Sequence, residues 1–183
     1  MKKVESVRRE YIVTLKYRSS KADVLLNFLI AHSDTLRLTR STWWQLWPLP
    51  WKKVGTEKDP IFRRQLEFVS KEFIRKEVTN KKYNDIPQGN ARYEHYYFKL
   101  QGKVKEVLSA AGLFMNNYDE EFFFGFEHPA FYKKGEMIAA FMSYTYTAIL
   151  LLTEKEREEL ERLGLQVAST ILLEGTDSCL IAQ

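Results

Sequence analysis

The residues best suited to acid–base or metal chemistry in this chain are three histidines and one cysteine. His32, His95 and His128 are far apart in the sequence, and no HExxH, HxH or paired-cysteine spacing is present. Protein zinc sites use such spacings, so we expect neither a metal nor a cofactor. Cys179 could act as a nucleophile with a distant histidine, but it lies in a segment that we expect to be a C-terminal tail.

Carboxylates occur near a histidine in two places, at Asp119-Glu120-Glu121 and at Glu127-His128. Acid pairs are common on protein surfaces, so they indicate catalysis less than they indicate a solvated surface. The chain has no GxGxxG, GxxxxGK[ST] or GxSxG motif, and its 8 glycines make a phosphate-cradling loop a poor prediction. The sequence therefore favours a protein without catalytic activity. An enzyme with a site among His95, His128 and the acidic residues is the third function considered.

All the tryptophans lie within nine residues, in a segment that two prolines stiffen. Pro48 and Pro50 prevent this segment from joining a helix or a central strand, so its entropy cost on binding is low. Tryptophan is enriched in binding hot spots, and four indoles in so short a span are hard to bury together. The pattern predicts an exposed aromatic surface for a protein partner. The alternative is a loop whose indoles fill the core, with each N–H bonded. The four residues are Trp43, Trp44, Trp47 and Trp51.

A basic helix face is the second candidate binding surface. Asp59-Pro60 is a favourable helix start, and the pattern that follows predicts a helix from Pro60 to about Asn80. At 100° per residue, one side of this helix is apolar and the opposite side is basic. The basic side could bind phosphates or an acidic protein, or it could be a solvated face partly neutralised by Glu67 and Glu72. The apolar side holds Phe62, Leu66, Val69 and Phe73. The basic side, here the basic ridge, holds Arg64, Lys71, Arg75 and Lys82.

Charge is distributed unevenly along the 183 residues. There are 28 Lys+Arg and 24 Asp+Glu, which gives a net charge of +4. Residues 1–105 carry a net charge of +12, and residues 106–183 carry −8. This asymmetry indicates a surface for a polyanion or an acidic partner, unless the two segments neutralise each other across the fold.

The aromatic segment Arg92 to Leu100 invites comparison with the strands that bind RNA. Alternating aromatic side chains on a sheet can stack on bases. The segment lacks the glycine spacing of the RNP1 pattern, so a strand with one buried aromatic face is the better interpretation.

Hydrophobic periodicity and turn signals predict an α+β fold with a mostly antiparallel or mixed sheet and about four helices. One domain is expected over residues 1–183, with a possible sub-boundary near 84–90. Expected strands are 10–17, 36–42, 92–100, 121–126, 137–144, 146–152 and 165–173. Expected helices are one capped by Ser20, one over 60–80, one over 102–111 and one from the Thr153–Glu156 capping box to Gly164.

The compartment follows from what the sequence contains. No apolar signal region follows the N-terminal lysines, and a single cysteine fits a reducing environment. The charge-free run from Met137 to Thr153 has Ser143 to Thr147 at its centre, so it predicts sheet rather than a membrane span. We expect a cytoplasmic protein without membrane contact.

These observations together favour a non-enzymatic protein-binding domain. Such a domain would block or neutralise a macromolecular partner, as immunity, antitoxin and inhibitor proteins do. A protein partner is favoured over nucleic acid, because the tryptophan cluster adds to the segregated charge. The second hypothesis is a nucleic-acid-binding protein that uses the basic ridge.

Overall fold

The fold is built from four helices and eight strands within the part of the chain that the computed structural model describes. The described residues are 7–16, 19–41, 60–81, 93–113, 126–142 and 145–169. Along the chain the elements are β1 (Arg9–Thr14), α1 (Ser20–His32), β2 (Thr35–Ser41), α2 (Pro60–Phe68), β3 (Phe73–Thr79), β4 (Tyr93–Lys99), α3 (Gly102–Ala111), β5 (Glu127–Lys133), β6 (Glu136–Met142), β7 (Thr147–Leu152), α4 (Glu154–Arg162) and β8 (Ala168–Ser169).

All eight strands belong to one sheet in the order β3-β4-β2-β5-β6-β7-β1-β8. Every ladder between neighbouring strands is antiparallel. The predicted α+β fold with a mostly antiparallel sheet is therefore confirmed. Strands β3 and β8 close the two ends of this order.

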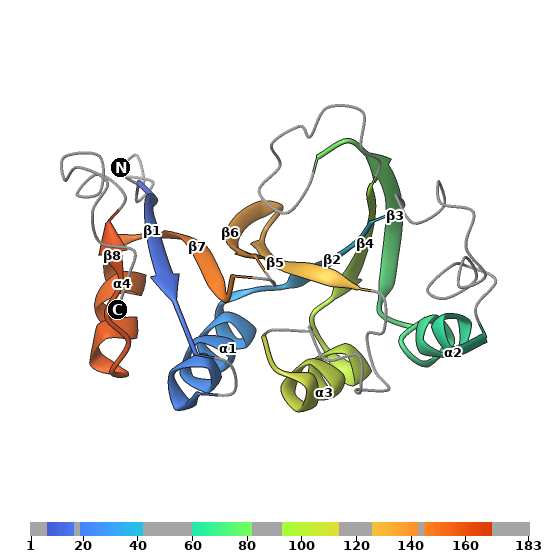
Figure 1. Cartoon of the computed structure of the whole chain (residues 1–183), viewed down its shortest axis with the longest axis horizontal. Helices are drawn as coiled ribbons and strands as arrows, with labels where there is room; N and C mark the ends of the chain where they lie inside the picture. Colours follow the sequence, from blue (N-terminus) through green and yellow to red (C-terminus); the bar gives the residue numbers. More distant parts are fainter. Residues whose placement is uncertain are drawn as a thin grey trace, which may run out of the picture.

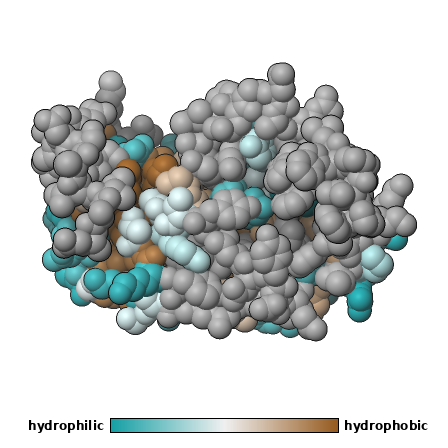
Figure 2. All heavy atoms as spheres, viewed as in Figure 1, coloured by the Kyte–Doolittle hydropathy of each residue, from teal (hydrophilic) through white to brown (hydrophobic). Residues whose placement is uncertain are grey.

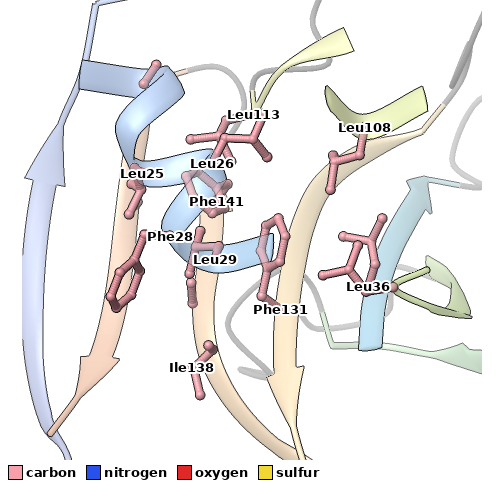
Figure 3. Close-up of a cluster of buried hydrophobic side chains, with 14 of the residues drawn as sticks. Leu25, Leu26, Phe28, Leu29, Leu36, Leu108, Leu113, Phe131, Ile138 and Phe141 are labelled. Atoms are coloured by element: carbon pink, nitrogen blue, oxygen red, sulfur yellow. The ribbon is translucent and has the colours of Figure 1, made fainter. Parts of the chain in front are cut away.

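The main core lies between the helices and one face of the sheet. We call this face of the sheet the helix face. Figure 1 shows α1, α3 and α2 along one side of the sheet, with α4 near β8. In Figure 3, leucines of α1 and α3 meet phenylalanines of the central strands. Phe131 and Phe141 are fully buried and meet edge to face, with ring centroids 5.8 Å apart. Burying this apolar area supplies most of the driving force for folding.

The other face of the sheet changes character along its length. At the β1–β7 end it carries Ile12, Ile149 and Leu151, all half-buried, and Figure 2 shows apolar residues at the surface there. At the β3–β5 end the same face carries charged and polar side chains, among them Arg37 and His95. We call this polar part the polar face.

Helix caps follow the sequence closely. The predicted capping box of α4 is confirmed, because the Thr153 hydroxyl accepts from the Glu156 N–H and the Glu156 carboxylate accepts from the Thr153 N–H. Helix α3 ends before Gly112, as predicted. Helix α1 differs by one residue from the expectation, because Ser19 and not Ser20 is the N-cap.

The predicted helix from Pro60 to Asn80 is wrong in its second half. Helix α2 ends at Phe68, and residues 73–79 form strand β3. The apolar stripe is real as far as Val69, which is buried with Phe62, whereas Phe73 is 43% exposed. Ile74, Val78 and Thr79 are β-branched, and pairing with β4 outweighs helix propensity in this segment.

Two further elements differ from the prediction. No strand was predicted over residues 127–133, where the structure has strand β5. Residues 121–125 of the predicted strand 121–126 lie outside the described residues, and Phe126 is not in a strand. In the predicted final strand 165–173, residues 165–167 are not strand, residues 168–169 form β8, and residues 170–173 lie outside the described residues. The run from Met137 to Thr153 contains β6 and β7, as predicted, and no described helix is long and apolar enough to cross a membrane.

The start of α3 gives a stability prediction. Gly102 has φ +50°, and a Cβ there would collide with the Glu72 carboxylate, which accepts a hydrogen bond from the Lys103 N–H at 3.4 Å. We expect Gly102→Ala to lower the free energy of unfolding by about 1–3 kcal/mol, measured by urea denaturation. Gly164→Ala is the control, since Gly164 has φ +89° and open space around the new Cβ. Equal losses in the two variants would show that the Glu72 contact is unimportant.

Candidate functional site

A pocket of about 550 Å³ opens on the polar face. Its floor comes from β2, β4 and β5, and its outer wall comes from the edge strand β3 and the residues that follow it. The antiparallel register explains this convergence, because Glu77 lies directly opposite His95 and Arg75 lies opposite Tyr97. The lining residues used below are Thr35, Arg75, Glu77, Lys81, His95, Tyr97 and Tyr132.

Arg75 and Tyr97 form a stacked pair at the pocket wall. The Arg75 guanidinium carbon lies 4.0 Å from the centroid of the Tyr97 ring, and Arg75 Nε lies 3.3 Å from Glu77 Oε1. The Arg75 side chain is 55% exposed and the Glu77 side chain is 46% exposed. The Tyr97 ring therefore packs against one side of the Arg75 guanidinium, and Arg75 also lines the pocket.

A second arginine supports Tyr97 from inside the protein. Arg37 has no exposed surface, and its guanidinium carbon lies 5.5 Å from the centroid of the Tyr132 ring. Its side chain hydrogen-bonds the Tyr97 side chain, which also hydrogen-bonds Glu77. A buried arginine, a tyrosine, a glutamate and an exposed arginine thus form one connected chain of contacts.

Electrostatics keep Glu77 ionised at neutral pH. The hydrogen bond from Tyr97 lowers the pKa of Glu77 most, the charge and hydrogen bond of Arg75 lower it further, and partial burial opposes them. Burial and the bond to Glu77 raise the pKa of Tyr97, which therefore stays protonated. The pocket thus presents fixed charges, two positive at Arg75 and Lys81 and one negative at Glu77.

Two of the histidines that are far apart in the sequence, His95 and His128, lie on β4 and β5, the two strands that flank β2 in the sheet. Thr39 of β2 is opposite His95 of β4 on one side and opposite Glu127 of β5 on the other. His128 Nε2 lies 3.4 Å from Glu127 Oε2, and His128 has a φ of +49° at an irregularity of the β2–β5 ladder. Both histidines are buried, but His95 lines the pocket and His128 does not. His32 of α1 is remote from the polar face. Its ring stacks on Phe28, and its Nε2 lies 3.1 Å from Glu159 Oε1.

The structure disperses the basic ridge. Arg64 is exposed on α2, Lys71 is exposed in the turn after it, and Arg75 lies on β3. Because no single helix carries these residues, the ridge as a helical face is a wrong prediction. Lys82 and the four tryptophans Trp43, Trp44, Trp47 and Trp51 lie outside the described residues, as do Cys179 and Asp119-Glu120-Glu121.

Sequence reasoning missed most of the pocket. Arg37, Glu77 and Tyr132 were not singled out, and Tyr97 was considered only as part of the aromatic segment 92–100. The alternation of residues 73–79 and 93–99 places Arg75, Glu77, His95 and Tyr97 on one face once both segments are taken as strands. Within the described segments, no three His, Cys, Asp or Glu side chains are grouped so that they could hold a metal ion. The arrangement suits the binding of an anion, because Arg75 and Lys81 both line a partly enclosed space.

Comparisons with protein-family models, with curated proteins and with solved structures found no significant match to this chain.

Proposed function

We propose that this protein binds single-stranded nucleic acid, with phosphate groups held in the pocket on the polar face. The stacked Arg75–Tyr97 pair carries the proposal. A guanidinium fixed on an aromatic ring loses little entropy on binding, and it offers N–H groups to phosphate oxygens and a flat surface to a base.

Size and charge support a single strand over a duplex. A pocket of about 550 Å³ suits a molecule of nucleotide size, and a duplex cannot enter it. Three of the four strands around the pocket, β2, β3 and β4, belong to residues 1–105, the segment with a net charge of +12. Lys99 lies on the same face as Tyr97, next to Thr35, and is exposed. A phosphate chain leaving the pocket would therefore meet a further cation.

Glu77 sets the selectivity of the pocket. Its carboxylate repels phosphate from one edge of Arg75, and it can accept hydrogen bonds from base N–H groups or from a ribose hydroxyl. Removal of this charge should strengthen the binding of phosphate in general and weaken discrimination among ligands.

The test is fluorescence anisotropy with a labelled single-stranded oligonucleotide at several salt concentrations. We expect Arg75→Ala and Lys81→Ala each to weaken binding by about 10-fold, because each removes a charge-assisted hydrogen bond. Each should also reduce the slope of log K against log salt by about 0.7. Glu77→Gln should bind more tightly than wild type.

Lys105→Ala is the matched control, since Lys105 is an exposed lysine of α3, a helix that covers the helix face. Competition by free nucleotide and by duplex separates the possible ligands. A wild-type protein that binds no single strand at low salt would refute the proposal, and so would equal losses in Arg75→Ala and Lys105→Ala.

Protein binding through Trp43, Trp44, Trp47 and Trp51 stays a prediction, because these residues are outside the described part of the chain. The hypothesis that the protein blocks or neutralises a macromolecular partner rests on these tryptophans and on the segregated charge. Salt dependence separates the two hypotheses. Binding of an oligonucleotide should weaken steeply as salt rises, whereas binding of a protein partner through the tryptophans should be far less sensitive to salt.

A further inference from the structure

Exposed apolar side chains gather at the β3 end of the sheet. Among the described residues, six large apolar side chains are exposed, and four of them lie in α2 and β3. Among the described strands, β3 is the last in the sheet order on that side. An edge strand with apolar neighbours favours pairing with another strand. The four side chains are Phe68, Phe73, Ile74 and Val78, exposed by 44%, 43%, 40% and 63%.

The sequence of β3 is complementary to itself when two copies pair antiparallel about Lys76. In that register Arg75 lies opposite Glu77 of the partner subunit, and Ile74 lies opposite Val78 of the partner subunit. Both contacts occur twice, as a two-fold axis requires. Opposite charges across a ladder are favourable and like charges are unfavourable. A register centred on Arg75 or on Glu77 would lose both the Arg75–Glu77 and the Ile74–Val78 contacts.

Strand β3 has two features that disfavour pairing with unrelated strands, a ladder irregularity and a central lysine, and both are compatible with this register. The ladder to β4 is irregular between Phe73 and Arg75, which leaves Arg75 to Thr79 regular. Lys76 would meet its own copy at the centre, but its Nζ lies 2.8 Å from Glu94 Oε1, so each charge is balanced within its own chain. The described part of β8, at the opposite end of the sheet, is only two residues long.

We propose that the protein forms a symmetric dimer in which two β3 strands pair antiparallel about Lys76 and join two sheets into one. The partner is a second copy of this chain, selected by the reciprocal Arg75–Glu77 contacts and by the apolar side chains beside them. This inference does not depend on nucleic-acid binding, because the contacts involve protein alone.

The test is sedimentation equilibrium of the full chain without nucleic acid, across the micromolar range. Wild type should dimerise. Val78→Lys should lose the dimer, since it places a charge against Ile74 of the partner subunit, and Leu163→Lys is the matched control at an exposed apolar residue of the turn after α4. Arg75→Glu and Glu77→Arg should each weaken the dimer by about 10-fold, and the double swap should restore it.

The charge swap keeps the test decisive if one variant fails to fold. A monomeric wild type, equal behaviour of Val78→Lys and Leu163→Lys, or a double swap no tighter than its single variants would overturn the proposal. Thermal melts of each variant show whether a lost dimer reflects a lost fold.

Discussion

Glu156→Ala should lower the free energy of unfolding by about 3 kcal/mol, the cost expected when one member of a buried ion pair is removed. The Glu156 carboxylate is a junction between three elements. It accepts from the Thr153 N–H at 2.9 Å, from the Thr153 hydroxyl at 3.0 Å and from Arg8 Nη1 at 2.7 Å. Arg8 Nη1 also donates to the Leu151 carbonyl at 2.7 Å. The side chain therefore ties the start of β1 to the end of β7 and to α4.

Two comparisons separate the cap from the ion pair. Thr153→Ala removes the hydroxyl of the capping box but leaves the pair with Arg8, so its loss should be about 1 kcal/mol. Glu156→Gln keeps the shape but not the charge and should fall between the two. Urea denaturation of the three variants measures these differences. A loss in Glu156→Ala no larger than that in Thr153→Ala would show that Arg8 contributes nothing.

The same carboxylate makes stability depend on pH in acid. Burial raises the pKa of Glu156, but hydrogen bonds from Thr153 and the charge of Arg8 outweigh it, and the net pKa is lowered. A carboxylate with a lowered folded-state pKa stabilises the fold above its unfolded pKa and stops doing so as pH falls through the folded value. Wild type should therefore lose stability below about pH 4.5, and Glu156→Gln should lose less over that range.

Local sequence signals predicted the caps and most strands because each depends on neighbouring residues. The Thr153–Glu156 box and the Gly112 stop are of this kind. The error at residues 60–80 arose because Phe62, Leu66 and Val69 do repeat at helical spacing, and the repeat extends by chance to Phe73. Strand β3 exists because it pairs with β4, some twenty residues later in the sequence. No local pattern reports such a partner.

The pocket was hidden for the same reason. His95 was noticed as a histidine, and Arg75 as part of a helix face, but their relation depends on the β3–β4 register. Arg37 gave no signal, since an arginine in an alternating segment is ordinarily exposed. Its burial follows from its position on β2, between β4 and β5 in the sheet order, with Tyr97 opposite it on one side and Ala130 on the other.

Replacement by alanine should have different effects at the two arginines beside Tyr97. Arg37→Ala should mainly reduce stability, whereas Arg75→Ala should mainly reduce oligonucleotide binding. Arg37 has no exposed surface, hydrogen-bonds Tyr97 and lies against the Tyr132 ring, so Arg37→Ala leaves a cavity and removes a donor from a buried hydroxyl. We expect it to lower the free energy of unfolding by about 3 kcal/mol or more. Arg75 is 55% exposed, so Arg75→Ala should change stability by no more than about 0.5 kcal/mol while it weakens oligonucleotide binding.

Urea denaturation and anisotropy on the same two variants give the comparison, and Arg37→Lys adds a third point. Lysine keeps the positive charge but not the planar fork that can bond Tyr97 and pack on Tyr132 together, so Arg37→Lys should be intermediate in stability. If Arg37→Ala is as stable as Arg75→Ala, the buried arginine does not support the pocket. Tyr97 would then be held by Glu77 and the surrounding strands, and the fixed position of Arg75 on its ring would need another cause.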